Sequence, residues 1–169
     1  MIVVENRGPV LVEVNCRQHN MDFSPLTMAC IGYNAFDMTA DALLGDPERS
    51  SRDIDDSEWW NGKYPLLPTL RAAGCMAHLV CFQSGTVVGV NHLDEIQSLE
   101  SVFDSEIYDT FSTLGSFIEP TVDIRTDAGW VQMIHEDSAH LRRDFDRIVE
   151  LMPTLFNVVT RVDEGKGAK

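Results

Sequence analysis

Two short β-rich runs separated by a tight turn set the strongest constraint on the fold of this chain. Residues 75–82 and 86–90 are rich in β-branched and other apolar side chains, and Ser84-Gly85 lies between them. A short glycine-containing connection between such runs is typical of an antiparallel hairpin. The sequence therefore predicts a hairpin here and, more broadly, a largely antiparallel sheet.

Helical patterns occur on both sides of this region. The segments 24–32 and 34–45 have Ser24 and Asn34 as candidate N-caps, and each ends at a glycine. Asp137 or Ser138 caps a longer helix with one apolar stripe. A short helix is expected over 92–102, and strands over 8–15, 114–137 (two or three, broken at Pro120 and at 127–129) and 154–159. The sum is an α+β fold, a largely antiparallel sheet flanked by helices.

Composition excludes several classes of partner. The 169-residue chain has a net charge of −14, which disfavours binding to a phosphate backbone, so no nucleic acid partner is expected. No apolar run reaches the roughly 18 residues of a membrane span, and the N-terminus does not resemble a secretory signal. A cytoplasmic location without a membrane partner is therefore expected. The four cysteines form no C-x-x-C pair and are expected to be free thiols: Cys16, Cys30, Cys75 and Cys81.

The acidic segment 46–68 interrupts the pattern of helices and strands. It contains Trp59-Trp60 but has no helical or strand period, and it is expected to be a surface excursion of the domain. Its acids, with those of 98–109, are most simply solvated. The domain is predicted to span 1–157, and a disordered tail is predicted over 158–169.

The strand beginning at Gly8 carries polar residues at every second position near its end. Glu13, Asn15 and Arg17 share one face of an extended chain. A carboxylate beside a carboxamide oxygen suits a hard cation such as Mg²⁺, and a guanidinium suits phosphate or carboxylate oxygens. The simpler interpretation is a strand that becomes polar as it reaches solvent, and E-x-N-x-R alone does not separate the two.

Other polar residues are weaker candidates. His135 and His140 lie five residues apart, a spacing that puts two side chains on different faces of a helix, so they are not expected to share a metal. His78 is expected to be a satisfied core or edge histidine.

Two further groups of polar residues are expected to be structural. Thr121, Asp123 and Arg125 alternate as if on one strand face. Arg142, Arg143, Asp144 and Asp146 are expected on a solvated helix face.

The ordered set of these motifs resembles the closing part of the ATP-grasp superfamily of carboxylate–amine ligases. In that family a Gly-Pro turn leads into a strand ending in E-x-N-x-R, then a substrate-facing loop, a short helix, a turn and a second helix. The matching positions here are Gly8-Pro9, Glu13, Asn15, Arg17, His19, Pro25-Leu26, Gly32-Tyr33, Asp37 and Asp41-Ala42. Residues 84–102 and 114–148 resemble later parts of the same lobe, so the resemblance covers about 8–156.

The resemblance implies a C-terminal lobe of an ATP-grasp ligase whose N-terminal nucleotide lobe is missing, since only seven residues precede Gly8. It implies ATP and Mg²⁺, or Mn²⁺, as cofactors, and Glu13 and Asn15 as metal ligands. Arg17 would be the catalytic residue that contacts the nucleotide γ-phosphate or the acyl-phosphate. His19 would lie in the substrate-binding loop.

The implied function is the C-terminal portion of an ATP-dependent ligase that joins a small-molecule carboxylate to an amine through an acyl-phosphate. The chain alone is expected to be inactive, and the apolar face left by the missing lobe is expected to favour oligomers. One alternative is a non-enzymatic remnant of the same fold. The other, from the residues alone, is a non-catalytic acidic α+β interaction domain that binds through residues 46–60.

Overall fold

A computed structural model describes residues 2–4, 8–10, 23–44 and 68–160 of the chain. Its elements in chain order are β1 (Ile2–Val4), β2 (Gly8–Val10), α1 (Ser24–Ile31), α2 (Ala35–Leu44), β3 (Ala73–Leu79), β4 (Gly85–Val90), α3 (Leu93–Gln97), β5 (Val102–Ile107), α4 (Asp109–Ser112), β6 (Phe117–Ile118), β7 (Gly129–His135), α5 (Ser138–Leu151), the 3-10 turn η1 (Met152–Thr154) and β8 (Phe156–Val159). Within these ranges no helix combines the length and apolar character needed to cross a membrane.

The strands form two three-stranded sheets and one separate ribbon. One sheet has the order β3-β7-β5, the other has the order β6-β4-β8, and β1 pairs with β2. Every pair is antiparallel. The predicted α+β class with largely antiparallel strands is therefore confirmed, although the strands are divided between small sheets instead of forming one.

The predicted hairpin of residues 75–90 is wrong, because its two strands belong to different sheets. After β3 the chain does not turn back. The Thr121 amide donates to the Cys81 carbonyl oxygen (2.8 Å), and the Cys81 amide donates to Thr121 Oγ1 (2.9 Å). β3 instead pairs with β7 over its whole length, from Ala73 opposite His135 to Leu79 opposite Gly129. This long register buries more apolar side chain than a local turn at Ser84-Gly85 would.

One core joins the two sheets. On the first sheet it contains Ala77 and Leu79 of β3 and Val131 and Met133 of β7, all at most 2% exposed. The helix α5 packs on this face through residues that include Ile148. The other sheet adds further buried side chains, among them Val87, Ile118 and Phe156.

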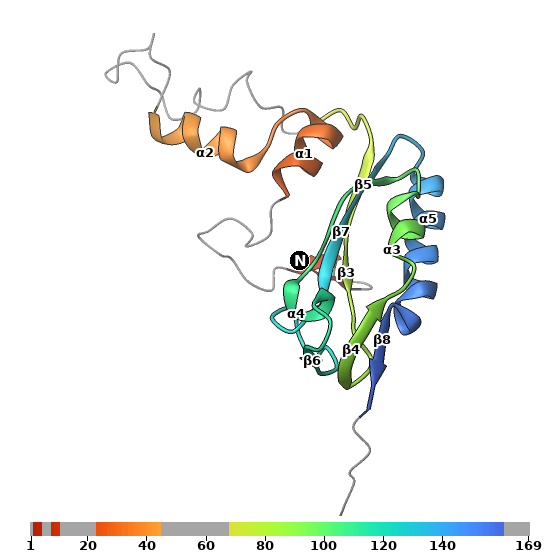
Figure 1. Cartoon of the computed structure of the whole chain (residues 1–169). Helices are drawn as coiled ribbons and strands as arrows, with labels where there is room; N and C mark the ends of the chain where they lie inside the picture. The colour runs from red at the N-terminus through yellow and green to blue at the C-terminus, as the bar shows by residue number, and fades with distance from the viewer. Residues whose placement is uncertain (1, 5–7, 11–22, 45–67, 161–169) are drawn as a thin grey trace, which may run out of the picture.

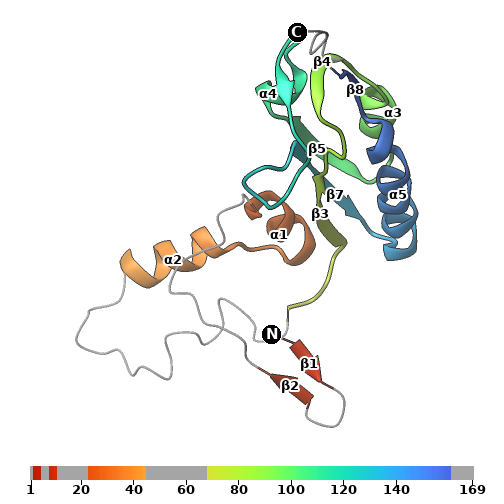
Figure 2. The ribbon, with the colours of Figure 1, turned by 90° about the horizontal axis from the view of Figure 1, so that it is seen from below.

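The helix α1 packs on the opposite face of the sheet β3-β7-β5 from α5 (Figures 1 and 2). Gly74 allows this close approach, because a Cβ atom there would lie 2.6 Å from Cys30 Sγ of α1. Leu26 is the buried residue of α1, at 3% exposure. The first sheet is therefore covered by a helix on each side.

The helix ends agree with the local sequence signals. Asn34 Oδ1 accepts hydrogen bonds from the amides of Phe36 (2.8 Å) and Asp37 (3.0 Å), and Asp137 caps α5 by accepting from the Ala139 amide. Gly32 ends α1 with a positive φ of 85°. The expected Ser24 cap of α1 is off by one residue, since Phe23 holds the cap position and no side chain caps the helix.

One segment departs from the sequence interpretation. The short helix was expected to run to residue 102 and no strand was expected over 103–109, but residues 102–107 form β5, which pairs with β7 from Val102 to Ile107 with one irregularity. Its acids Asp104 and Glu106 are exposed, as predicted. In β5 the side chains of Val102 and Ile107 pack against the core, while Phe103 is 58% exposed. β8 ends at Val159, the last residue of the strand predicted over 154–159.

Candidate functional site

The residues that carry the ligase resemblance lie outside the described residues. Glu13, Asn15, Arg17 and His19 all fall within 11–22. The acidic excursion falls within 45–67, apart from its last residue, and Cys16 is also not described. The structure does describe the elements on either side of residues 11–22, which are β2 before them and α1 after them. Those four residues therefore stay predictions.

The expected strand face of Thr121, Asp123 and Arg125 is wrong, because these residues lie in a turn. Thr126 Oγ1 accepts the amides of Val122 (2.8 Å) and Asp123 (2.9 Å), and Asp123 Oδ1 accepts the Arg125 amide (2.9 Å). This backbone hydrogen bond from Arg125 lowers the pKa of Asp123. The side chains thus hold the turn that connects β6 to β7.

His78 is a satisfied edge histidine, as predicted. It lies on β3, at the edge of its sheet, and its Nδ1 is 2.6 Å from Oδ2 of Asp127. The Asp127 side chain is only 4% exposed and the His78 side chain 32% exposed. Burial of the carboxylate fixes the imidazole in one orientation. The pair therefore offers one oriented imidazole ring, whose exposed part faces solvent.

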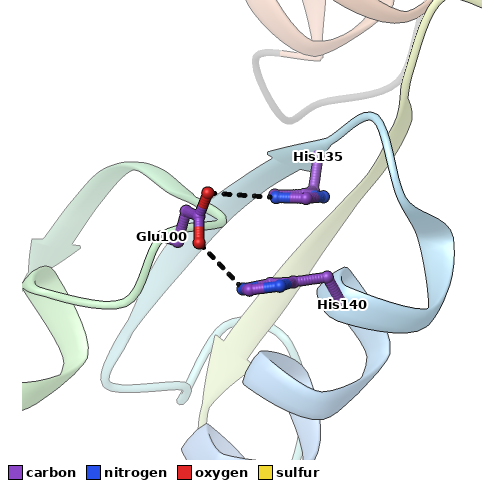
Figure 3. Close-up of side chains that lie close together, drawn as sticks. All are labelled: Glu100, His135 and His140. Atoms are coloured by element: carbon purple, nitrogen blue, oxygen red, sulfur yellow. Dashed lines mark ion pairs between the residues drawn. The ribbon is translucent and has the colours of Figure 1, made fainter.

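A second histidine cluster joins three elements of the chain (Figure 3). Glu100 Oε1 lies 3.5 Å from Nε2 of His135, and Glu100 Oε2 lies 3.4 Å from Nε2 of His140. The two imidazole rings stack with centroids 4.2 Å apart and planes 9° apart. One donor atom from each of the three residues can be chosen so that all lie within 4.8 Å of one another. We call these three residues the Glu-His-His cluster.

The expectation that His135 and His140 point apart is wrong, because they are not on one helix. His135 is the last residue of β7, and His140 lies in the first turn of α5. Asp137 caps α5 between them, so the chain changes direction after His135. The cap at Asp137 was the signal that His135 and His140 do not share one helix, and it was visible in the sequence. Nothing near Glu100 in the sequence indicated its part in the cluster.

The backbone of Ser101 ties the three elements of the cluster together. Its carbonyl oxygen accepts a hydrogen bond from the Ile134 amide (2.7 Å), next to His135. Its amide donates to Oδ2 of Asp144 (3.0 Å), one helical turn beyond His140. Ser101 is 1% exposed, so both hydrogen bonds are shielded from water. The position of Glu100 relative to both histidines therefore follows from buried backbone contacts.

Asp144 does not belong to a solvated helix face, contrary to expectation. Its side chain is 13% exposed, and Oδ2 also lies 3.4 Å from Nε2 of His140. Burial acts to raise the pKa of Asp144, but the hydrogen bond from Ser101 and the neighbouring His140 and His135 outweigh it, and the pKa is lowered. Arg142 and Asp146 do form the exposed i,i+4 ion pair expected of a solvated face.

Three of the cysteines are described, and all three are free thiols, as predicted. Burial raises the pKa of Cys30, Cys75 and Cys81, and Cys30 raises that of Cys75 further. A raised thiol pKa lowers the fraction of reactive thiolate. These cysteines therefore contribute packing rather than chemistry.

Comparison with known proteins gives a similarity of fold. No family model matches the sequence, and no curated protein matches it. The crystal structure of an L-amino acid ligase from Bacillus licheniformis is similar to 82% of this chain, with a TM-score of 0.54 and 12% identity. The chain spans about 29% of the length of that ligase structure. At this identity the similarity shows the fold alone: the arrangement of helices and strands is like that of part of the L-amino acid ligase structure.

Proposed function

We propose that this chain is part of an ATP-dependent carboxylate–amine ligase, with its nucleotide site shared with a further lobe. The observation that carries the proposal is the fold similarity over 82% of the chain to an L-amino acid ligase. It agrees with the E-x-N-x-R motif, which in the sequence lies directly before the described helices α1 and α2. The motif and the fold are independent observations, because identity to that structure is only 12%.

The proposed roles follow from the chemistry of each side chain. Glu13 and Asn15 offer a carboxylate and a carboxamide oxygen, which fit Mg²⁺, and Mn²⁺ takes the same ligands. Arg17 would bind the oxygens of the transferred phosphoryl group through its guanidinium. His19 would lie beside the substrate. Together the cation and Arg17 would offset the negative charge that accumulates between ATP and a carboxylate.

In the proposed reaction a carboxylate oxygen attacks the γ-phosphorus of ATP. An acyl-phosphate forms as the bond to ADP breaks. The amine then attacks the acyl carbon, forms the C–N bond, loses a proton and releases inorganic phosphate. The carboxylate and the amine are small molecules of the kind joined by an amino acid ligase.

Titration of Mg-ATP into the purified chain tests the proposal. We expect weak binding that Glu13→Ala and Arg17→Ala each reduce at least tenfold. Glu13→Ala removes a proposed ligand of Mg²⁺, and Arg17→Ala removes a charged hydrogen bond to phosphate (about 1.5–3 kcal/mol). Glu119→Ala and Arg125→Ala are matched controls, because both residues are exposed and distant in sequence from the motif. Equal losses in the controls, or no effect of either motif variant on measurable binding, would contradict the assigned roles.

A further inference from the structure

The distances in the Glu-His-His cluster leave room for a shared ion. The three Nε2-to-oxygen contacts, including that of Asp144, measure 3.4–3.5 Å, longer than the roughly 2.7–2.9 Å of a charge-assisted hydrogen bond. Bonds of about 2.0–2.2 Å to a tetrahedral Zn²⁺ place neighbouring ligand atoms roughly 3.3–3.5 Å apart. One donor atom from each of the three residues lies within 4.8 Å of the others, so a shift of the side chains would bring all three to the distances of a common ion.

The orientation of His135 also suits a metal ligand. Its Nδ1 lies 2.9 Å from the Asp137 amide, which donates to the ring when Nδ1 is unprotonated, and 3.1 Å from the Asp137 carbonyl oxygen, which accepts from the Nδ1-H tautomer. In the Nδ1-H tautomer Nε2 carries the lone pair that a metal needs, and Figure 3 shows Nε2 directed toward Glu100. Histidines that bind metals characteristically donate their other ring N–H to a carbonyl or carboxylate oxygen.

The backbone around the cluster is held in place before any ion binds. The three side chains come from the connection after α3, the end of β7 and the first turn of α5, which Ser101 links through buried hydrogen bonds. The histidine side chains are 20% and 27% exposed, whereas Glu100 is 71% exposed. Because the two rings are nearly parallel, at least one of them must turn about its side-chain bonds before both Nε2 lone pairs meet at one ion, and the exposed side leaves room for water.

We propose that Glu100, His135 and His140 bind one divalent transition-metal ion, Zn²⁺ by preference, with water completing a tetrahedral site. Two imidazoles and one carboxylate are borderline donors that suit Zn²⁺ better than Mg²⁺ or Ca²⁺. Three protein ligands leave one position open, so the ion would keep an exchangeable water. This site uses none of the residues proposed above for Mg-ATP and does not depend on that function.

The full chain, treated with a chelator and dialysed, is titrated with ZnCl₂ by calorimetry. We expect one equivalent to bind, and His135→Ala or His140→Ala to weaken binding at least ~100-fold, because direct ligands matter more than outer partners worth 10- to 100-fold. His92→Ala is the matched control, since His92 is a partly exposed histidine 3.8 Å from Glu95 and outside the cluster. It should bind Zn²⁺ like the unaltered chain.

Glu100→Gln keeps the experiment decisive if a histidine variant fails to fold, because the Glu100 side chain is largely exposed. It should fold, as judged by circular dichroism, and bind Zn²⁺ at least tenfold more weakly. With Co²⁺ in place of Zn²⁺, the strong visible absorption of a tetrahedral site should appear and be absent in the cluster variants. Absence of stoichiometric binding, unchanged affinity in folded cluster variants, or loss of binding in Glu13→Ala would each overturn the proposal.

Discussion

The helices α2 and α5 show that apolar content does not decide burial. α2 is the more apolar of the two, yet Phe36, Leu43 and Leu44 are 59%, 80% and 83% exposed. α5 is rich in charged residues, yet Ile148 is fully buried and Leu151 is 5% exposed. Both helices were expected from the sequence, and both form.

The difference lies in what each helix packs against. The apolar stripe of α5 packs against the core-facing side chains of β3 and β7. In the described part of the chain, the large apolar side chains of α2 are instead exposed to solvent. An exposed apolar face of this kind characteristically marks an interaction site. The following predictions test whether α5 and α2 differ in this way, from the largest expected effect to the smallest.

The largest effect is expected from Ile148→Ala in α5. Ile148 is 0% exposed within the core, so its truncation should lower the free energy of unfolding by about 2–5 kcal/mol through lost burial and a cavity. Val149→Ala is the matched control on the same helix, because Val149 is 45% exposed. Urea denaturation measures both. Similar losses in the two variants would show that α5 does not depend on its buried stripe.

A smaller effect is expected from Asp144→Ala, which removes the acceptor for the buried Ser101 amide. The free energy of unfolding at pH 7 should fall by about 1–3 kcal/mol. Asp144→Asn should lose less, because its carboxamide oxygen still accepts that hydrogen bond.

This loss should depend on pH. The pKa of Asp144 is lower in the folded state, so the stabilisation is fully present above the unfolded pKa of about 3.9 and is lost as pH falls through the folded value. Denaturation curves of the unaltered chain and Asp144→Ala should therefore converge below about pH 4. A constant difference down to pH 2 would contradict the ionic part of this contact.

The smallest effect on stability is expected from Leu43→Gln combined with Leu44→Gln in α2. Both side chains are at least 80% exposed, so the free energy of unfolding should change by no more than about 0.5 kcal/mol. We expect self-association, measured by sedimentation velocity at increasing concentration, to decrease. A large loss of stability would show that α2 is packed in solution as α5 is, and unchanged association would exclude these leucines from the contact.

Local signals in the sequence predicted much of the fold. The α5 helix was correct in its Asp137 cap and in the buried stripe that includes Ile148, and the Asn34 cap of α2 was also correct. The pairing of the strands was not predicted correctly. Ser84-Gly85 indicated a hairpin, but β3 and β4 separate into two sheets. β5 was not predicted as a strand, because acids interrupt its apolar residues.

For the candidate sites, too, some expectations were correct and others were wrong. His78 was correctly expected to be satisfied, although its partner Asp127 was not foreseen. His135 and His140 were dismissed on the assumption of one continuous helix, and Glu100 was not considered. The E-x-N-x-R residues stay a prediction from sequence.

The sequence by itself determined the longer helices, the Asn34 and Asp137 caps and the α+β class. Capping hydrogen bonds and the 3.6-residue period act between residues that are neighbours along the chain, so they can be recognised without the fold. Only the tertiary structure decided which strands pair, which apolar helix face is buried and that Glu100 meets two histidines. These outcomes depend on burying side chains from segments far apart in sequence, and no local pattern contains that information.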